Sequence, residues 1–155
     1  MHDIILIEPK IPQNTGTIAR LCAATNTKLI LVGELGFSLD DKYLKRAGLD
    51  YWEHVNWEHQ PDVESYIESL RSSGKTSYML SSKAKKLYTD VTYCSSQPLI
   101  FGSETTGLSE AFKNDCPGEC ITIPMANNNI RSLNLANAVS IVHYEAIRQY
   151  NVKEL

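Results

Sequence analysis

Short apolar runs alternate with amphipathic segments along this chain. A run of a few apolar residues that ends at Gly, Pro or a polar residue is typical of a buried strand. Such runs lie at residues 3–7, 28–32, 51–55, 76–80, 99–101 and 121–125. Helical spacing or capping residues indicate helices within residues 14–26, 40–47, 61–74 and 133–150. Strands that alternate with helices predict an α/β fold with a mainly parallel sheet flanked by helices on both faces.

Polar residues mark the starts of three of these helices. Asn14 or Thr15 can cap the first helix, Asp62 opens the helix that ends at Gly74, and Ser132 opens the last one. The last helix carries an apolar stripe at helical spacing, which is Leu135, Val139, Val142 and Ala146, widened by Ala138, Ile141 and Ile147. A helix this apolar at the end of a small domain packs in the core or meets a partner chain.

Two of the predicted strands are followed by polar loops. The run 99–101 leads into Gly102-Ser-Glu-Thr-Thr-Gly107, and the run 121–125 leads into an asparagine-rich segment that ends at Ser132. The carboxyl ends of parallel strands meet at one edge of a sheet, where ligands bind in open α/β folds. The alternative, two ordinary strand-to-helix turns, stays open from this pattern alone.

Two basic features have a possible role in binding phosphate. Arg20 lies one turn beyond Gly16, so its guanidinium can reach back toward the electropositive start of the first helix, a place that suits a phosphate. The segment 81–86 holds Lys83, Lys85 and Lys86, the strongest local basic signal in the chain. The alternatives are an exposed arginine on a helix surface and a solvated loop.

Length and composition set the class of protein. A chain of 155 residues is long enough for one domain with a real core, and we expect a single domain over residues 1–155. An apolar content of 43% with 21% charged residues excludes a disordered chain. No apolar run reaches the roughly 20 residues of a transmembrane helix, and the first residues do not have the pattern of a signal peptide.

The cysteines, the histidines and the net charge limit the classes of function further. Scattered cysteines without a C-x-x-C pair indicate reduced thiols in a cytosolic protein, and the four histidines have no metal-ligand spacing. The formal net charge of −3 argues against a broad nucleic-acid footprint. Any contact with RNA therefore needs a local basic patch, or two chains that combine their patches.

Three separated motifs carry a family resemblance. They are P-x-N-x-G-x-x-x-R at residues 12–20, F-G-S-E-T-T-G-L at 101–108, and I-P-M followed by R-S-L-N-L-A-N-A within 123–138. In this order and spacing they resemble the SPOUT methyltransferases, the trefoil-knotted RNA methyltransferases that use S-adenosylmethionine. Within that family the chain is most similar to the small tRNA (cytidine/uridine-34) 2′-O-methyltransferases, which modify the wobble ribose.

The resemblance implies properties that periodicity does not reveal. It implies a deep C-terminal trefoil knot and a homodimer whose active site draws on both chains. It also implies S-adenosyl-L-methionine as the cofactor, S-adenosyl-L-homocysteine as its product, and no metal. The expected partner is the tRNA anticodon stem-loop, in the cytoplasm and without a membrane.

The resemblance further implies a cofactor slot built from three loops. The residues that it assigns to this slot are Leu80, Gly102, Glu104, Gly107, Ile123, Ser132 and Leu133. Three of them, Leu80, Ile123 and Leu133, can enclose an adenine, while Gly102 permits close approach of the backbone. Glu104 could hold Arg20 in position or favour the sulfonium charge, and its alternative is an exposed loop carboxylate.

On the acceptor side the resemblance assigns catalysis to Arg20 and Tyr144. Arginine stays protonated near neutral pH, so binding the phosphate and stabilising the developing alkoxide is an easier role for Arg20 than that of a general base. Tyr144 is equally consistent with a simple interface tyrosine. Asn14, Arg131 and Asn134 are expected to organise the loops and to touch the substrate.

Two other classes of function are compatible with the sequence. One is a SPOUT enzyme that methylates another RNA or another atom. The other is a non-catalytic nucleotide- or RNA-binding module, which the presence of Arg20, Glu104 and Asn134 disfavours.

Overall fold

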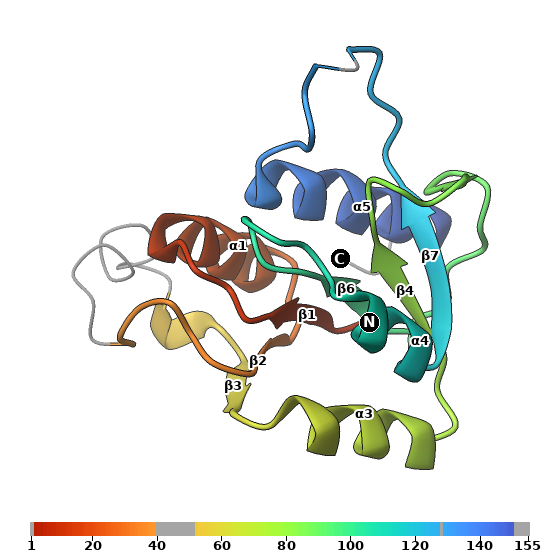
Figure 1. Cartoon of the computed structure of the whole chain (residues 1–155). Helices are drawn as coiled ribbons and strands as arrows, with labels where there is room; N and C mark the ends of the chain where they lie inside the picture. The colour runs from red at the N-terminus through yellow and green to blue at the C-terminus, as the bar shows by residue number, and fades with distance from the viewer. Residues whose placement is uncertain (1, 40–51, 128, 151–155) are drawn as a thin grey trace.

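A parallel sheet forms the centre of the molecule (Figure 1). The computed structural model describes residues 2–39, 52–127 and 129–150, with only the backbone of Tyr150. Its strands are β1 Ile4–Ile7, β2 Leu29–Val32, β3 Trp57–Gln60, β4 Ser77–Leu80, β5 Lys86–Leu87, β6 Leu99–Phe101 and β7 Gly118–Thr122. They run in the order β3-β2-β1-β6-β4-β7-β5, and every pairing is parallel. The predicted α/β class is confirmed.

Helices cover both faces of this sheet. They are α1 Pro12–Ala24, α3 Val63–Ser72, α4 Glu110–Asp115 and α5 Leu135–Tyr150, with a short 3₁₀ helix η1 at Trp52–His54. Side chains of β1 alternate between the faces: Ile4 and Leu6 pack in the core under α1 and α5, while Ile5 and Ile7 pack in the core over α3 and α4. No helix in the described parts of the chain is long and apolar enough to cross a membrane.

The starts of α1 and α5 differ from the prediction. Helix α1 begins at Pro12, with Ile11 as an N-cap that lacks a side-chain hydrogen bond, so neither Asn14 nor Thr15 caps it. Proline suits the first helical turn because its φ is already helical and its missing N–H has no partner there. Helix α5 is capped by Asn134 rather than opened at Ser132: the Asn134 Oδ1 accepts from the N–H groups of Ala136 at 2.9 Å and Asn137 at 3.3 Å.

Two predicted strands are misplaced. Of the predicted strand 51–55, the described residues 52–55 are not a strand, because η1 occupies Trp52–His54 and the edge strand β3 follows it. All four side chains of β3 are half-buried, so it lacks the apolar run on which the prediction relied. Strand β7 starts three residues before the predicted 121–125 and ends at Thr122, in register with β4. The predicted helix at 40–47 lies outside the described residues.

Short elements escaped prediction, whereas α3 was predicted correctly. Asp62 caps α3, with the N–H of Ser65 2.6 Å from its Oδ1. The two-residue strand β5, which begins at the last residue of the lysine-rich segment, and the six-residue helix α4 were both missed. The N-cap of α4 is Ser109, whose hydroxyl accepts from the N–H of Phe112 at 3.0 Å. Elements this short leave too few residues for a periodic pattern.

A buried pair of histidines joins the start of the chain to α5. The His2 Nε2 lies 2.7 Å from the His143 Nδ1, and the other ring nitrogen of His143 lies 2.9 Å from the Thr25 hydroxyl just after α1. Both rings are essentially fully buried. Burial lowers the pKa of His2 to about 3 and that of His143 to about 4. His2 and His143 therefore have a structural role, because they join the start of the chain, the end of α1 and α5 through buried hydrogen bonds.

Candidate functional site

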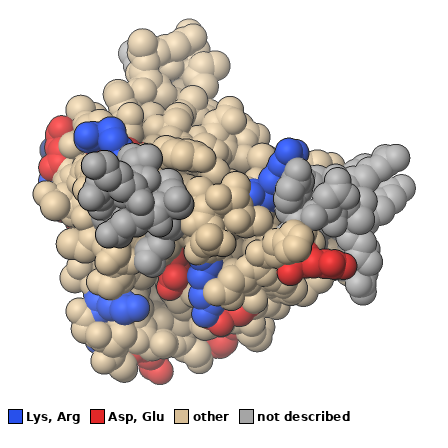
Figure 2. Space-filling model, turned by 180° about the vertical axis from the view of Figure 1, so that it is seen from behind, with Lys and Arg blue, Asp and Glu red and all other residues tan. Residues whose placement is uncertain are grey.

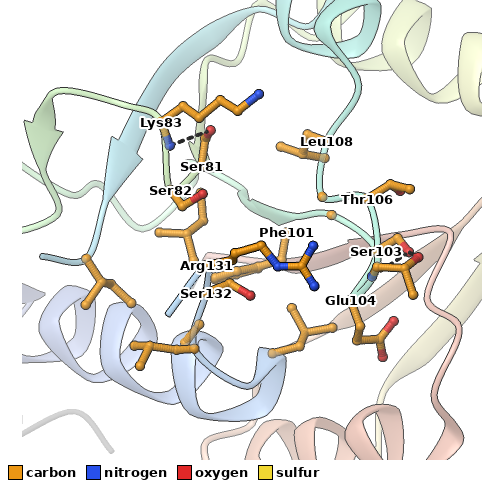
Figure 3. Close-up of a pocket in the computed structure, with 18 of the residues that line it drawn as sticks. Ser81, Ser82, Lys83, Phe101, Ser103, Glu104, Thr106, Leu108, Arg131 and Ser132 are labelled. Atoms are coloured by element: carbon orange, nitrogen blue, oxygen red, sulfur yellow. Dashed lines mark hydrogen bonds between the residues drawn. The ribbon is translucent and has the colours of Figure 1, made fainter. Parts of the chain in front are cut away.

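A cavity of about 500 Å³ opens at the carboxyl edge of the sheet (Figure 3). Its walls are the loop after β4, the loop after β6 and the segment between β7 and α5, with a contribution from the start of α1. Strands β6, β4 and β7 are neighbours in the sheet and run parallel, so their loops converge at one edge. The two predicted polar loops therefore lie together, as expected for a ligand site in an open α/β sheet.

The cavity collects most of the residues singled out from the sequence. Ten of them line it: Asn14, Leu80, Gly102, Glu104, Gly107, Ile123, Arg131, Ser132, Leu133 and Asn134. The two predicted catalytic residues do not line it. Arg20 is exposed on α1, and Tyr144 is 50% exposed on α5. Of the other lining residues, Lys113 was not singled out from the sequence, Leu108 was only the last residue of the motif 101–108, and Lys83 was only one member of the basic segment 81–86.

The loop after β6 is a tight, preformed turn. Ser103 and Gly107 form an antiparallel bridge, with the Gly107 N–H donating to the Ser103 carbonyl at 2.8 Å. Gly107 has a φ of 67°, which favours glycine. A Cβ on Gly102 would lie 2.2 Å from the carbonyl carbon of Gly107, so any larger residue forces the turn apart. The shape of this cavity wall thus depends on Gly102.

Replacing Gly102 tests this dependence. We expect Gly102→Ala to lower the free energy of unfolding by about 3 kcal/mol, at the upper end of overpacking costs, and to weaken cofactor binding. Gly74→Ala is the matched control: nothing lies within 4 Å of the added Cβ, and only the φ of 66° opposes it. The control should cost about 1 kcal/mol and leave the cavity unchanged. Urea unfolding and calorimetry measure both; equal losses for the two variants would contradict the expectation.

Glu104 connects the cavity wall to the start of α1. Its carboxylate accepts from the backbone N–H of Lys10 at 2.8 Å, from that of Ile11 at 3.2 Å and from the Asn14 side-chain amide at 3.1 Å. The Asn14 carbonyl oxygen in turn accepts from the Asn134 amide at 2.9 Å. Since Asn134 also caps α5, a continuous chain of hydrogen bonds runs from the first turn of α1 to the first turn of α5.

This network gives Glu104 a definite position. Figure 3 shows its carboxylate turned away from the centre of the cavity. A carboxylate at this place offsets the unpaired N–H groups and the positive end of α1, the helix that carries Arg20 about two turns further on. Two of its three donors are backbone amides, which leave no signal in a sequence.

The hydrogen bond between Glu104 and Asn14 predicts that an amide at position 104 and a carboxylate at position 14 will partly compensate each other. Glu104→Gln loses an acceptor for α1, and Asn14→Asp sets two carboxylates about 3.1 Å apart. Each single variant should lower the free energy of unfolding by about 1–3 kcal/mol. In the double variant the introduced amide at position 104 can donate to the introduced carboxylate at position 14, so we expect a smaller loss than the sum of the two. A double-mutant cycle from urea unfolding measures the coupling; additive losses would show that the contact has no energetic weight.

The cavity fits a bent nucleoside with a charged tail. Its volume lies within the roughly 300–1,000 Å³ of small-molecule sites. Apolar side chains line the cavity, among them Leu80, Ile123 and Leu133, and the tight turn from Gly102 to Gly107 forms one of its walls. Among the described residues no cluster of His, Cys, Asp or Glu is arranged to hold a metal ion. The residues present therefore suit S-adenosylmethionine.

The fold and this site define a class of protein. A parallel sheet whose carboxyl edge holds a nucleoside-sized cavity, built from the three motif segments, is the arrangement expected of a SPOUT-type methyltransferase. Residues 1–144 match the model of the SpoU rRNA Methylase family. The chain belongs to this family.

Particular relatives resemble the chain over nearly its whole length. The tRNA (cytidine(34)-2′-O)-methyltransferase of Methylovorus glucosotrophus is 43% identical over 152 residues, which cover 97% of each chain. A solved structure described as "Structural insights into the 2-OH methylation of C/U34 on tRNA" has a TM-score of 0.90 and 38% identity, covering 97% of this chain and 96% of its own. The SpoU methyltransferase AviRb from Streptomyces viridochromogenes, solved in complex with the cofactor AdoMet, has a TM-score of 0.82 and 27% identity, covering 96% of this chain and 57% of its own.

Proposed function

We propose that this protein transfers a methyl group from S-adenosyl-L-methionine to the ribose 2′-hydroxyl of the wobble nucleotide, cytidine or uridine 34, of tRNA. The observation that carries the proposal is the cavity itself, in which residues of all three family motifs meet. Similarity over 97% of the chain to a relative named for this reaction supports the choice of substrate. A tRNA substrate also agrees with a location in the cytoplasm.

The cavity residues have separate tasks in this proposal. Leu80, Ile123 and Leu133 would enclose the adenine, Gly102 would allow contact with the backbone, and Ser132 offers a small polar group. When bound, S-adenosylmethionine supplies a methyl group on a positively charged sulfur, which makes that methyl electrophilic. The preformed turn between Ser103 and Gly107 orders this wall before the ligand arrives, so less conformational entropy is lost on binding.

The acceptor hydroxyl must be aligned with the methyl group and its developing negative charge must be stabilised. A protonated arginine can do the second task and can bind a neighbouring phosphate through its fork of N–H donors. We assign this role to Arg20, at the exposed side of α1, with Tyr144 as a second group on α5. Neither lines the cavity of its own chain, which supports a site completed by a second copy.

We infer that two copies pair through the outer side of α5. Ile141 is 36% exposed and Tyr144 50% exposed on this helix, an apolar area that a partner would cover. We also infer that the backbone carries the trefoil knot of the SPOUT fold, since a structure of this type superposes on 97% of the chain.

Mixing two inactive variants tests the shared site. Arg20→Ala removes the acceptor-side group, and Leu133→Arg fills the cofactor cavity from a position that is 37% exposed. If Arg20 acts on the cavity of the partner, a mixed dimer contains one complete site, and we expect about a quarter to a half of wild-type activity per mixed dimer. Activity is measured on co-expressed chains, with each variant alone as the control. No recovery in dimers shown to be mixed by mass spectrometry would place Arg20 in the site of its own chain.

Methyl transfer to bulk tRNA, followed by mass-spectrometric mapping of the modified ribose, tests the function. The expected product is a 2′-O-methyl group at position 34. A methyl group on a base or at another nucleotide would keep the enzyme class but overturn the substrate. Absence of S-adenosylmethionine binding in calorimetry would overturn the enzyme class as well.

A further inference from the structure

The cavity contains more positive than negative charge, although the chain has a net charge of −3. Its ionisable lining residues are Lys83, Glu104, Glu110, Lys113 and Arg131. The two acids already have partners. Glu104 is held by three N–H donors, and Glu110 lies 2.7 Å from the Lys113 ammonium. The charges of the cavity lining that have no partner of opposite sign therefore belong to basic residues.

Lys83 and Arg131 carry this unmatched charge. Both are exposed, and the side chain of neither makes a hydrogen bond or ion pair with another described residue. The hydrogen bond to Lys113, followed by the charges of Lys113 and Lys83, lowers the pKa of Glu110. The one carboxylate of Glu110 thus cannot neutralise both lysines, while Arg131 makes no ion pair with either acid of the cavity lining.

The two side chains come from different walls of the cavity. Lys83 belongs to the loop after β4, and Arg131 to the segment before α5. Figure 3 shows both extending toward the wall that carries Thr106 and Leu108, with their charged ends apart. Figure 2 shows the face opposite to the view of Figure 1, where basic and acidic residues are interspersed rather than gathered. A local pair such as this is what a net acidic chain needs to hold an anion.

We propose that Lys83 and Arg131 form a two-sided grip for an RNA phosphodiester at the mouth of the cofactor cavity. This proposal rests on the proposed function and adds to it the residues that hold the RNA backbone over the methyl donor. A guanidinium binds phosphate oxygens through two N–H donors and an ammonium binds as a point charge, so the pair suits a phosphate. The positively charged sulfur of the cofactor gains nothing from two further cations, whereas the phosphates that flank the acceptor ribose do.

Salt dependence of tRNA binding separates a phosphate contact from other effects. We expect Lys83→Gln and Arg131→Gln each to weaken tRNA binding about threefold to tenfold and to reduce the slope of log K against log salt by about 0.7–0.9, the change for one phosphate contact. The double variant should lose about twice that slope. Arg131→Lys keeps the charge but loses the fork, so its slope should stay while its affinity falls. Lys75→Gln, at an exposed lysine near the start of β4, is the control and should change neither.

Cofactor affinity is the second quantity to measure for the same variants. Calorimetry with S-adenosylhomocysteine should give the same dissociation constant for all variants within about twofold, because side chains that hold the RNA phosphate make no ion pair with the cofactor. Methylthioadenosine, which lacks the amino-acid carboxylate, serves as the comparison ligand. If the salt slope is unchanged and the variants weaken binding of S-adenosylhomocysteine but not of methylthioadenosine, the pair binds the cofactor carboxylate and the proposal is overturned. An unchanged slope and unchanged cofactor binding would overturn it too. Failure of wild-type protein to methylate position 34 would instead refute the proposed function, because salt-dependent binding is measured without methyl transfer.

Discussion

Arg20→Ala should reduce methyl transfer about 100-fold or more and leave cofactor affinity nearly unchanged. The scale is that of removing a positioned electrostatic group from a transition state. Arg20 is exposed and lies outside the lining of the cavity, so neither the cofactor site nor the core depends on its side chain for shape. Single-turnover transfer to tRNA measures the loss, while calorimetry and thermal melting check the cofactor site and the fold. Turnover close to wild type would move the search for the acceptor-side group to Tyr144 or to the RNA.

The conservative variant and the pH profile distinguish two roles for this arginine. Arg20→Lys keeps the charge and loses the bidentate fork, so we expect little recovery. A permanently charged group leaves the chemical step flat with pH wherever protein and RNA are intact. A general base with a very high pKa makes the rate rise through the neutral and alkaline range. We expect the flat profile, and a continuous rise in the single-turnover rate would contradict it.

The architecture follows from the sequence wherever an element is long or fully buried. Strands β1, β2 and β6 are continuous apolar runs because both of their faces are covered, and the stripe on α5 is buried along Leu135, Val139, Val142 and Ala146. Strand β3 was missed for the opposite reason, since an edge strand with half-buried polar residues has no such run. The order of the strands in the sheet depends on contacts distant in sequence, which no local pattern contains.

The candidate site was predictable as a set of loops but not as a set of contacts. Motif residues from three segments line one cavity because parallel strands end at the same edge. The partners of Glu104 could not be predicted: its hydrogen bonds go to the backbone of Lys10 and Ile11, which are 94 and 93 residues away in the chain. Lys83 was only one of a lysine-rich group in the sequence. The path of the loop after β4 places Lys83 in the cavity lining, whereas Lys85 of the same loop is not part of it.

Acid should destabilise this protein well above the pH at which most carboxylates titrate, because of the buried pair His2 and His143. Burial is the main cause that lowers the pKa of both, from 6.5 to about 3 and about 4, and the charge of His143 lowers that of His2 further. A lowered pKa in the folded state means that the unfolded chain binds protons first. The stability contributed by the neutral pair is therefore complete above pH 6.5 and is lost as the pH falls from 6.5 toward 4.

The expected loss is about 1.4 kcal/mol per pH unit for each histidine that the unfolded chain protonates, so about 2 kcal/mol or more separates pH 6.5 from pH 5. Urea unfolding across this range measures it. Replacing the pair by His2→Asn and His143→Gln should flatten the dependence even though it lowers stability at pH 7, because the replacements do not titrate. His54→Gln, at an exposed histidine of η1, should keep the wild-type slope. An equal slope in the paired variant and in wild type would assign the acid sensitivity to other groups.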